Sequence, residues 1–451
     1  MARAALPPLQ IPSPHNEPRP VEEAATFSTP GYAMAYATFF VFGGTCVASW
    51  QCIILSIDTF IAMYPDGMVG FVFPVVNMSA LLVITLFMLI AGRQLPLDRR
   101  MRSGFTCMLL SCAGLPLLQW TSLSQLLRYA ATLLLLIIAS MASALIQSSS
   151  YGLAAVFGPA FLQAIDAGKG TGAMVLVLAR IATKWGLDAD ATDLTALSLF
   201  FGLAVAAIVV AFLMYAMLDQ NVYAKTKLET YVRIQFNTPL ALPLPSPVRS
   251  PIKSPSFFPA ATESTPMLKD VAVNIDDDEP ESPSDEASIL SVVRRAWRPV
   301  GMAFATFCVC LACFPGLTSS VASTSSWFPV LMVGAYTVGD LIGKMLPLHC
   351  MLLSVETVHY PLLLQLSFVP LFMYDVLHPY LLPDVATYGL VALLGLVTGF
   401  VGTSSMMLAP TTCRDVEQEL AGITGSLAII TGLFTGSYVG LFLNFIVQLM
   451  Q

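Results

Sequence analysis

The sequence predicts an all-α polytopic membrane protein in which eleven transmembrane helices are arranged as six plus five. Of 451 residues, 56% are hydrophobic and 11% are charged, whereas a soluble domain carries about 25% charged residues. The mean hydropathy is correspondingly high, at +0.75. The apolar residues form long runs, and a helix needs roughly 20 of them to cross a bilayer. These observations exclude a soluble globular protein.

The hydrophobic runs define the expected helices in chain order. The start of the chain, MARAALPPLQIPSPHNEPRP, has Pro where a cleavable signal peptide needs an apolar region, so we expect residues 1–30 to form a cytosolic tail. The spans are expected near residues 33–56, 70–92, 104–120, 127–150, 171–187, 193–217, 299–318, 327–347, 358–378, 385–408 and 422–447. The third and fifth of these spans are short.

Residues 218–296 differ in composition from the rest of the chain. They include the Pro- and Ser-rich segment PLPSPVRSPIKSPSFFP and the acidic segment IDDDEPESPSDE, and neither can bury enough apolar surface to fold. We expect a disordered cytosolic linker between an N-terminal bundle, 31–217, and a C-terminal bundle, 297–451. Ser246, Ser250 and Ser254 each precede Pro, which suits phosphorylation by a proline-directed kinase; the alternative is a plain tether.

The basic residues indicate which connections face the cytosol, because Lys and Arg concentrate there. They occupy alternate connections: Arg93, Arg99, Arg100 and Arg102; Lys169; the 218–296 linker; and Arg414. Acidic residues occupy the others: Asp66; Asp188, Asp190 and Asp193; and Asp384. The pattern predicts a cytosolic amino terminus and, with eleven spans, an extracytosolic carboxyl terminus.

Several chemistries find no support in the sequence. The nine cysteines lie almost entirely within the spans, and CVCLACF (308–314) has no nearby histidine or acid, so we expect packing there rather than a metal site. The four histidines are not in metal-ligand spacing, and no Gly-x-x-x-x-Gly-Lys-Ser/Thr loop is present to bind ATP. The net charge of −7 argues against a nucleic-acid partner. We therefore predict no enzyme activity, no cofactor and no metal.

Polar residues inside the spans are costly in hydrocarbon and need a reason. They come from both halves of the chain: Asp58, Gln147, Ser149, Arg180, Asp340, Lys344 and Gln365. Asp340 and Lys344 are four residues apart, so on a helix they share one face and can pair. A set drawn from both halves favours a solute pathway between two bundles; the alternative is structural bracing between helices.

Five segments, spread from the first span to the last, carry a resemblance to a known family. They are FGGTCVASWQCIILSIDTFIAMYP (42–65), LIQSSSYGLAAVFGPAFLQAIDAGKGTGA (145–173), FPGLT (314–318), WFPVLMVGAYTVGDLIGKML (327–346) and FVGTSSMMLAPTTCRDVEQELAGITGS (400–426). In the fourth segment, Tyr336-Thr337-x-x-Asp340-x-x-Gly343-Lys344 is similar to a signature that reads Phe-Asn-x-x-Asp-x-x-Gly-Arg. The chain resembles the equilibrative nucleoside transporter family, solute carrier family 29.

The resemblance implies a major-facilitator-like arrangement that moves nucleosides, or alternatively nucleobases, across a lipid bilayer by alternating access. It implies a substrate site formed by Trp50, Gln51, Ile54, Gln147, Ser149, Thr337, Asp340 and Lys344. Gly152, Gly168 and Gly170 match small-residue positions of the family, with the last two in a turn, and are expected to permit close helix packing. This chain departs from the family in having Lys344 where Arg is usual, and Lys cannot form a bidentate fork.

Two questions stay open at the level of sequence. Transport is either facilitated or coupled to protons, in which case Asp58 would carry the proton; otherwise Asp58 is a solvated acid at the outer rim. The membrane is expected to be the plasma membrane, with an endolysosomal or vacuolar membrane as the alternative. A membrane receptor or enzyme with a polar intramembrane site remains the competing interpretation of the function.

Overall fold

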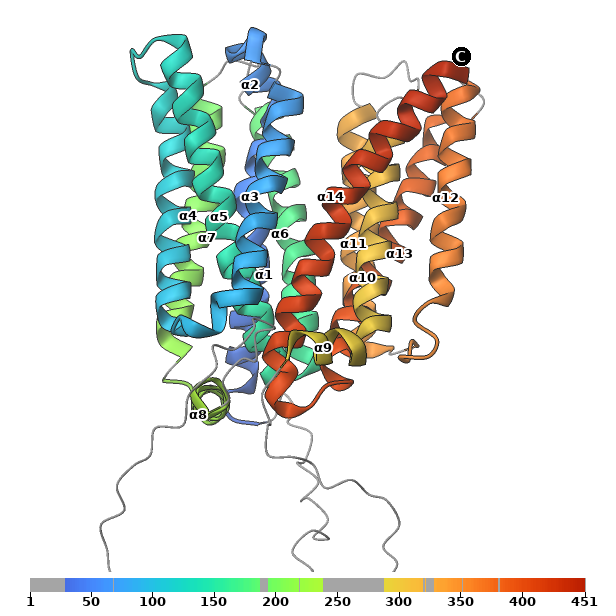
Figure 1. Ribbon diagram of the computed structural model, residues 1–451. Coiled ribbons are helices and arrows are strands. Elements are labelled where there is room, and N and C mark those ends of the chain that lie inside the picture. Colours follow the sequence, from blue (N-terminus) through green and yellow to red (C-terminus); the bar gives the residue numbers. More distant parts are fainter. Residues whose placement is uncertain are drawn as a thin grey trace, which may run out of the picture.

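The computed structural model describes residues 29–67, 69–186, 194–218, 220–237, 288–318, 321, 328–350, 352–379 and 382–450. All regular elements in these ranges are helical and form two bundles (Figure 1). The N-terminal bundle contains α1 (Tyr32–Leu55), α2 (Ile57–Met63), α3 (Val69–Ala91), α4 (Leu97–Gln119), α5 (Gln125–Phe157), α6 (Pro159–Gly186) and α7 (Leu194–Leu218). The C-terminal bundle contains α10 (Trp297–Leu311), continued by η3 (Ala312–Leu317), then α11 (Phe328–His349), α12 (Tyr360–Leu377), α13 (Asp384–Thr411) and α14 (Gln418–Met450).

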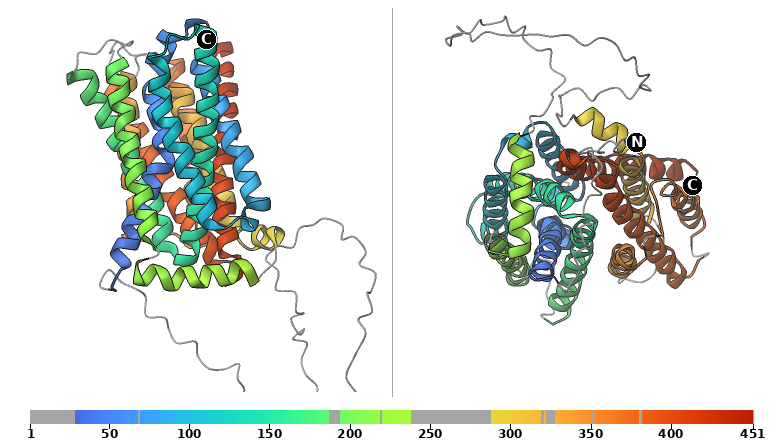
Figure 2. Two further views of the ribbon diagram at one scale, coloured as in Figure 1. Left: turned by 90° about the vertical axis from the view of Figure 1, so that its left-hand side faces the viewer. Right: turned by 90° about the horizontal axis from the view of Figure 1, so that it is seen from below.

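Two short helices flank the connection between the bundles. They are α8 (Val222–Asn237) and α9 (Ile289–Arg295), and both lie at one end of the molecule, which we call the linker end; the carboxyl terminus lies at the opposite, far end (Figure 1). α8 runs across the linker end of the N-terminal bundle (Figure 2). The expected linker, 218–296, therefore has helical margins, whereas its centre, including Ser246, Ser250 and Ser254, lies outside the described residues.

Ten helices are long and apolar enough to cross a membrane within the described residues, by length and composition. The chain is thus a multi-pass membrane protein. The expected eighth span, α11, has 22 residues and carries Asp340 and Lys344, and it is not among these ten. The count of eleven spans remains a prediction, which requires α11 to cross as well.

The boundary between the expected fourth and fifth spans was wrong. α5 continues to Phe157 and α6 begins at Pro159, with a single Gly158 between them whose φ of 120° is in a region that favours glycine. Gly168, Lys169 and Gly170 consequently lie within α6 and not in a turn. The polar side chains of this segment suggested a loop, but they are buried between helices.

The apolar cores differ between the two ends of the molecule. Near the linker end, one cluster includes residues of both bundles: Phe39, Phe42, Phe105, Phe157 and Phe161 of the N-terminal bundle, with Ala303, Met406, Met407, Ala428 and Ile429 of the C-terminal bundle. Towards the far end the clusters are separate. One belongs to the N-terminal bundle and includes Phe60, Phe73 and Phe200; the other belongs to the C-terminal bundle and includes Phe328, Phe368 and Val447. The bundles are therefore joined through their linker-end halves.

Candidate functional site

Asp340 and Lys344 form an ion pair on α11. The distance from Lys344 Nζ to Asp340 Oδ2 is 2.5 Å, and the two residues are 6% and 9% exposed. Tight packing of α11 on α13 fixes this part of the helix: a Cβ added to Gly339 would lie 1.9 Å from the Ala392 carbonyl oxygen. Small residues allow such close backbone approach, and they fix the position of the charged pair in the fold.

A second charged cluster lies in the N-terminal bundle and was not found by the sequence analysis. The Tyr151 hydroxyl of α5 donates a hydrogen bond to Asp166 Oδ1 of α6. Lys169 Nζ donates to the Tyr151 oxygen at 2.9 Å and lies 4.5 Å from the centroid of its ring. Tyr151, Asp166 and Lys169 are 0%, 4% and 8% exposed. The signal that could have found the cluster is the rarity of charged residues within membrane helices.

Polar contacts between described residues join the two bundles. Gln163 of α6 donates to the Lys344 carbonyl oxygen at 3.1 Å, and its own side-chain oxygen accepts from Tyr36 at 2.6 Å. Gln147 of α5 donates to Ser426 of α14 at 3.2 Å. Arg100 of α4 and Glu419 of α14 form a buried ion pair at 3.3 Å. These contacts lie in the same linker-end region as the apolar cluster that both bundles share.

Glycines of both bundles lie where their helices meet. A Cβ on Gly422 of α14 would be 2.3 Å from the Tyr151 carbonyl oxygen of α5, and one on Gly152 would be 3.1 Å from Glu419 Cγ. A Cβ on Gly170 of α6 would be 3.1 Å from the Leu341 Cα of α11. Gly168 instead contacts α1, since its Cβ would lie 1.8 Å from the Phe40 carbonyl oxygen. The helices of the linker end therefore pack with little space between them.

The remaining expected substrate residues are more dispersed. Trp50, Gln51 and Ile54 lie on α1 and are half-buried, and Trp50 packs on the far-end core of its own bundle. The Ser149 hydroxyl of α5 is buried and has no hydrogen-bond partner among the described residues. The Thr337 hydroxyl donates to the Val333 carbonyl oxygen of its own helix at 2.7 Å. The structure thus brings Asp340 and Lys344 close to α6 and leaves the α1 residues nearer the far end.

Other intramembrane polar residues serve their own bundle. Gln365 of α12 donates to the Thr306 carbonyl oxygen at 2.9 Å and to Thr398 Oγ1 at 3.0 Å, which ties α12 to α10 and α13. Arg180 of α6 donates to Thr59 of α2 at 3.4 Å. Asp58 lies within α2, and its side chain is outside the described part of the chain. In the ranges that the structure covers, no group of three or more His, Cys, Asp and Glu side chains could hold a metal ion.

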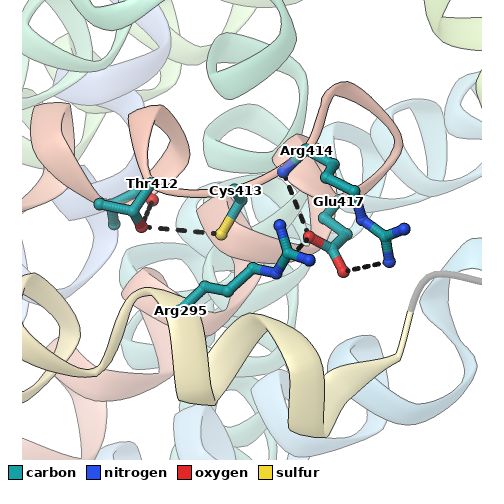
Figure 3. A network of polar contacts seen from close by, with 6 residues as sticks. Arg295, Thr412, Cys413, Arg414 and Glu417 are labelled. Carbon is teal, nitrogen blue, oxygen red and sulfur yellow. Dashed lines mark hydrogen bonds and ion pairs between the residues drawn. The ribbon is translucent and has the colours of Figure 1, made fainter. Parts of the chain in front are cut away.

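A polar network at the linker end connects α9 to the turn before α14 (Figure 3). The carboxylate of Glu417 is buried; it accepts from the Arg414 side chain and backbone, each at 3.2 Å, and lies 3.8 Å from Arg295 of α9. Cys413 lies beside this network. Burial is the main cause that raises the pKa of its thiol, and the Glu417 charge adds to it, while a hydrogen bond with Thr412 and the Arg295 charge oppose it.

Comparison with known sequences identifies relatives over nearly the whole chain. A family model described as "Nucleoside transporter" matches residues 133–445. Among curated proteins, "Equilibrative nucleotide transporter 8" of Arabidopsis thaliana is 24% identical over 91% of this chain and 95% of its own length. "Equilibrative nucleotide transporter 1" of the same plant is 25% identical over 93% of this chain and 88% of its own length. "Equilibrative nucleoside transporter 4" of Homo sapiens is 29% identical over 33% of this chain and 29% of its own length.

Solved structures show the same fold at low sequence identity. The major facilitator superfamily proton:xylose symporter XylE aligns over 93% of this chain and 90% of its own length, with a TM-score of 0.55 and 10% identity. A bacterial homologue of the iron transporter ferroportin, in an outward-facing state, aligns over 92% and 98% of the two chains, with a TM-score of 0.54 and 10% identity. The matched family model covers well over half of the sequence. The chain belongs to the nucleoside transporter family.

Proposed function

We propose that this protein, a membrane nucleoside transporter by its family, moves nucleosides along the interface of its two bundles by alternating access. The observation that carries the mechanism is the asymmetry of that interface. Two apolar clusters shared by both bundles, together with polar contacts among the described residues, join the bundles near the linker end, whereas the far-end cores are separate. Because transporters of this architecture rock one bundle against the other, these contacts would break when the linker end opens.

We propose that the substrate site lies where α1, α5 and α11 face the interface. Its members would be Trp50, Gln51, Ile54, Gln147, Ser149, Thr337, Asp340 and Lys344. Trp50 is half-buried and has a flat face on which a base can stack. Gln147 has both a donor and an acceptor for a base edge, and Asp340 would accept from the sugar or the base. Gly152, Gly168 and Gly170 would pack helices together and not contact the substrate.

The orientation and the membrane are part of the proposal. The basic connections lie at the linker end, so we propose that this end, with the amino terminus, is cytosolic and that the carboxyl terminus is extracytosolic. The structure then corresponds to a state closed on the cytosolic side. The plasma membrane is the proposed location, with an endolysosomal or vacuolar membrane as the alternative, and a proline-directed kinase acting on Ser246, Ser250 and Ser254 is the proposed regulatory partner.

Uptake into proteoliposomes tests the function. Purified protein should take up labelled adenosine or uridine, with Asp340→Asn as the inactive control of nearly equal size. Unlabelled nucleoside should compete with the labelled compound. Nucleobases and nucleotides should be tested as competitors in the same assay, since the names of the two plant relatives refer to nucleotides. Uptake that competes only with nucleobases or only with nucleotides would reassign the substrate, and no uptake of any of the three would contradict the proposal.

Proton coupling is tested by varying the external pH. If Asp58 carries the proton, uptake rises as the external pH falls, and Asp58→Asn makes uptake independent of pH. Wild-type uptake that stays constant from about pH 5 to 8, a range that spans the protonation of a perturbed carboxylate, would leave facilitated diffusion as the mechanism.

A further inference from the structure

One face of α6 contacts α11 of the other bundle. Gln163, Asp166 and Gly170 are spaced at i, i+3 and i+7, so they lie on one side of the helix. Gln163 donates to the Lys344 carbonyl oxygen, and a Cβ on Gly170 would lie 3.4 Å from Lys344 Cδ. Asp166 is between these two contacts along the helix and on the same side of it. Asp166 is therefore part of the interface between the bundles.

The two carboxylate oxygens of Asp166 are in different situations. Oδ1 accepts the hydrogen bond from the Tyr151 hydroxyl, whereas Oδ2 is buried and has no hydrogen-bond partner among the described residues. Buried polar atoms normally have a partner, and an exception needs an explanation. Oδ2 is therefore able to accept a hydrogen bond from a further donor.

The charges around Asp166 indicate what kind of donor fits. In their ordinary forms at neutral pH, Tyr151 of α5 and Cys46 of α1 carry no charge, whereas Lys169 of α6 and Asp340 and Lys344 of α11 carry one charge each. With Asp166 included, the charges of the two carboxylates and the two ammonium groups sum to zero. A neutral donor would satisfy Oδ2 and preserve this balance, whereas a phosphate or an added proton would leave a net buried charge, which is expensive.

We propose that Asp166 is a specificity-determining residue, whose Oδ2 accepts a hydrogen bond from a hydroxyl or amino group of a neutral substrate. This inference rests on the proposed nucleoside transport. Oδ2 is buried in this structure, so the hydrogen bond would form when the bundles separate at the linker end. Asp166 then belongs to the linker-side part of the pathway, beyond the site formed with α1.

The test compares transport from the two sides in right-side-out and inside-out membrane vesicles. Asp166→Asn can still accept from Tyr151 through its amide oxygen, but it presents an N–H where Oδ2 was. We expect the KM measured from the linker side to rise about tenfold or more, as for a lost hydrogen bond to a charged group. The KM measured from the far side should change by less than about twofold, because this hydrogen bond is not formed there.

Two further variants separate substrate contact from bracing of the helices. Tyr151→Phe removes the hydrogen bond between α5 and α6 but keeps the free oxygen, so it should retain the wild-type preference among substrates. Asp166→Asn combined with Lys169→Met restores the charge balance and should show the same rise in linker-side KM. This double variant is the measurement to use if the single Asp166 variant is not inserted into the membrane.

Substrate analogues identify the donor group. If a ribose hydroxyl is the donor, the linker-side KM of the wild type should be higher for a 2′- or 3′-deoxynucleoside than for the parent nucleoside. If the base amine is the donor, the linker-side KM should be higher for inosine than for adenosine. Asp166→Asn should abolish that difference. An unchanged linker-side KM in the variant, an equal rise on both sides, or the same loss of preference in Tyr151→Phe would overturn the inference. Absence of wild-type nucleoside transport would instead overturn the proposed function.

Discussion

The two ends of the molecule hold the bundles together to different extents. Near the linker end, a shared apolar core, the Arg100–Glu419 ion pair and the contacts of Gln147 and Gln163 all cross from one bundle to the other. Towards the far end, each bundle has its own core. A transporter can therefore be closed at one end by individually modest interactions when the two bundles share few contacts at the other end.

Buried charged residues also occur in the region that joins the bundles. Asp166, Lys169, Asp340 and Lys344 are buried in the region that joins the bundles. Burying a charge is tolerated when it is paired and hydrogen-bonded, and breaking such a pair is costly. Such paired charges determine how the helices pack in the closed state. They do not prevent opening, because water can solvate them when the linker end opens.

The largest effect is expected for the α11 pair. Asp340→Ala should reduce uptake by roughly two orders of magnitude or more, because removing one partner of a buried pair costs about 3–5 kcal/mol and leaves Lys344 unpaired. The measurement is nucleoside uptake normalised to the amount of inserted protein. Lys344→Arg keeps the pair and should retain transport. Full uptake by Asp340→Asn would show that the pair is a structural brace.

A smaller effect is expected for added volume between the bundles. Gly422→Ala would place a methyl group 2.3 Å from the Tyr151 carbonyl oxygen, and overpacking of this kind costs about 1–3 kcal/mol. Closure of the linker end should weaken, so uptake should fall about fivefold or more, as that energy implies. Gly389→Ala on α13, where nothing lies within 4 Å, is the matched control and should transport normally. Equal behaviour of the two variants would mean that closure does not limit transport.

The smallest effect concerns the thiols at the linker end. The pKa of Cys413 is raised, chiefly by burial, so the reactive thiolate is scarce at neutral pH and becomes more abundant as the pH rises. Cys413 should therefore react with maleimide more slowly than the exposed Cys350, and its rate should increase with pH. Mass spectrometry after timed labelling measures both rates. Faster labelling of Cys413 than of Cys350 at neutral pH would contradict the buried environment of the network around Glu417.

The sequence predicts some of the buried polar contacts of the candidate site and misses others. The spacing of Asp340 and Lys344 predicts their pairing, because residues four apart share one helical face. The cluster of Tyr151, Asp166 and Lys169 was missed, since the polar residues of α6 lower its hydropathy and suggest a turn. Hydropathy alone cannot distinguish a polar residue in a loop from one buried between two bundles. The contacts of α6 with α5 and α11 show that its polar residues are buried between helices.

Alternating access requires that the two ends open in turn and that nucleoside binding changes which end is open. Spin-label distances test it directly, with one pair at the far end (Ile61 of α2 and Tyr374 of α12) and one at the linker end (Val222 of α8 and Leu290 of α9), all exposed positions. Saturating nucleoside should shorten the far-end distance in a fraction of the molecules. The linker-end distance should lengthen in an equal fraction. Distances that stay unchanged, or that change in the same direction at both ends, would contradict the account.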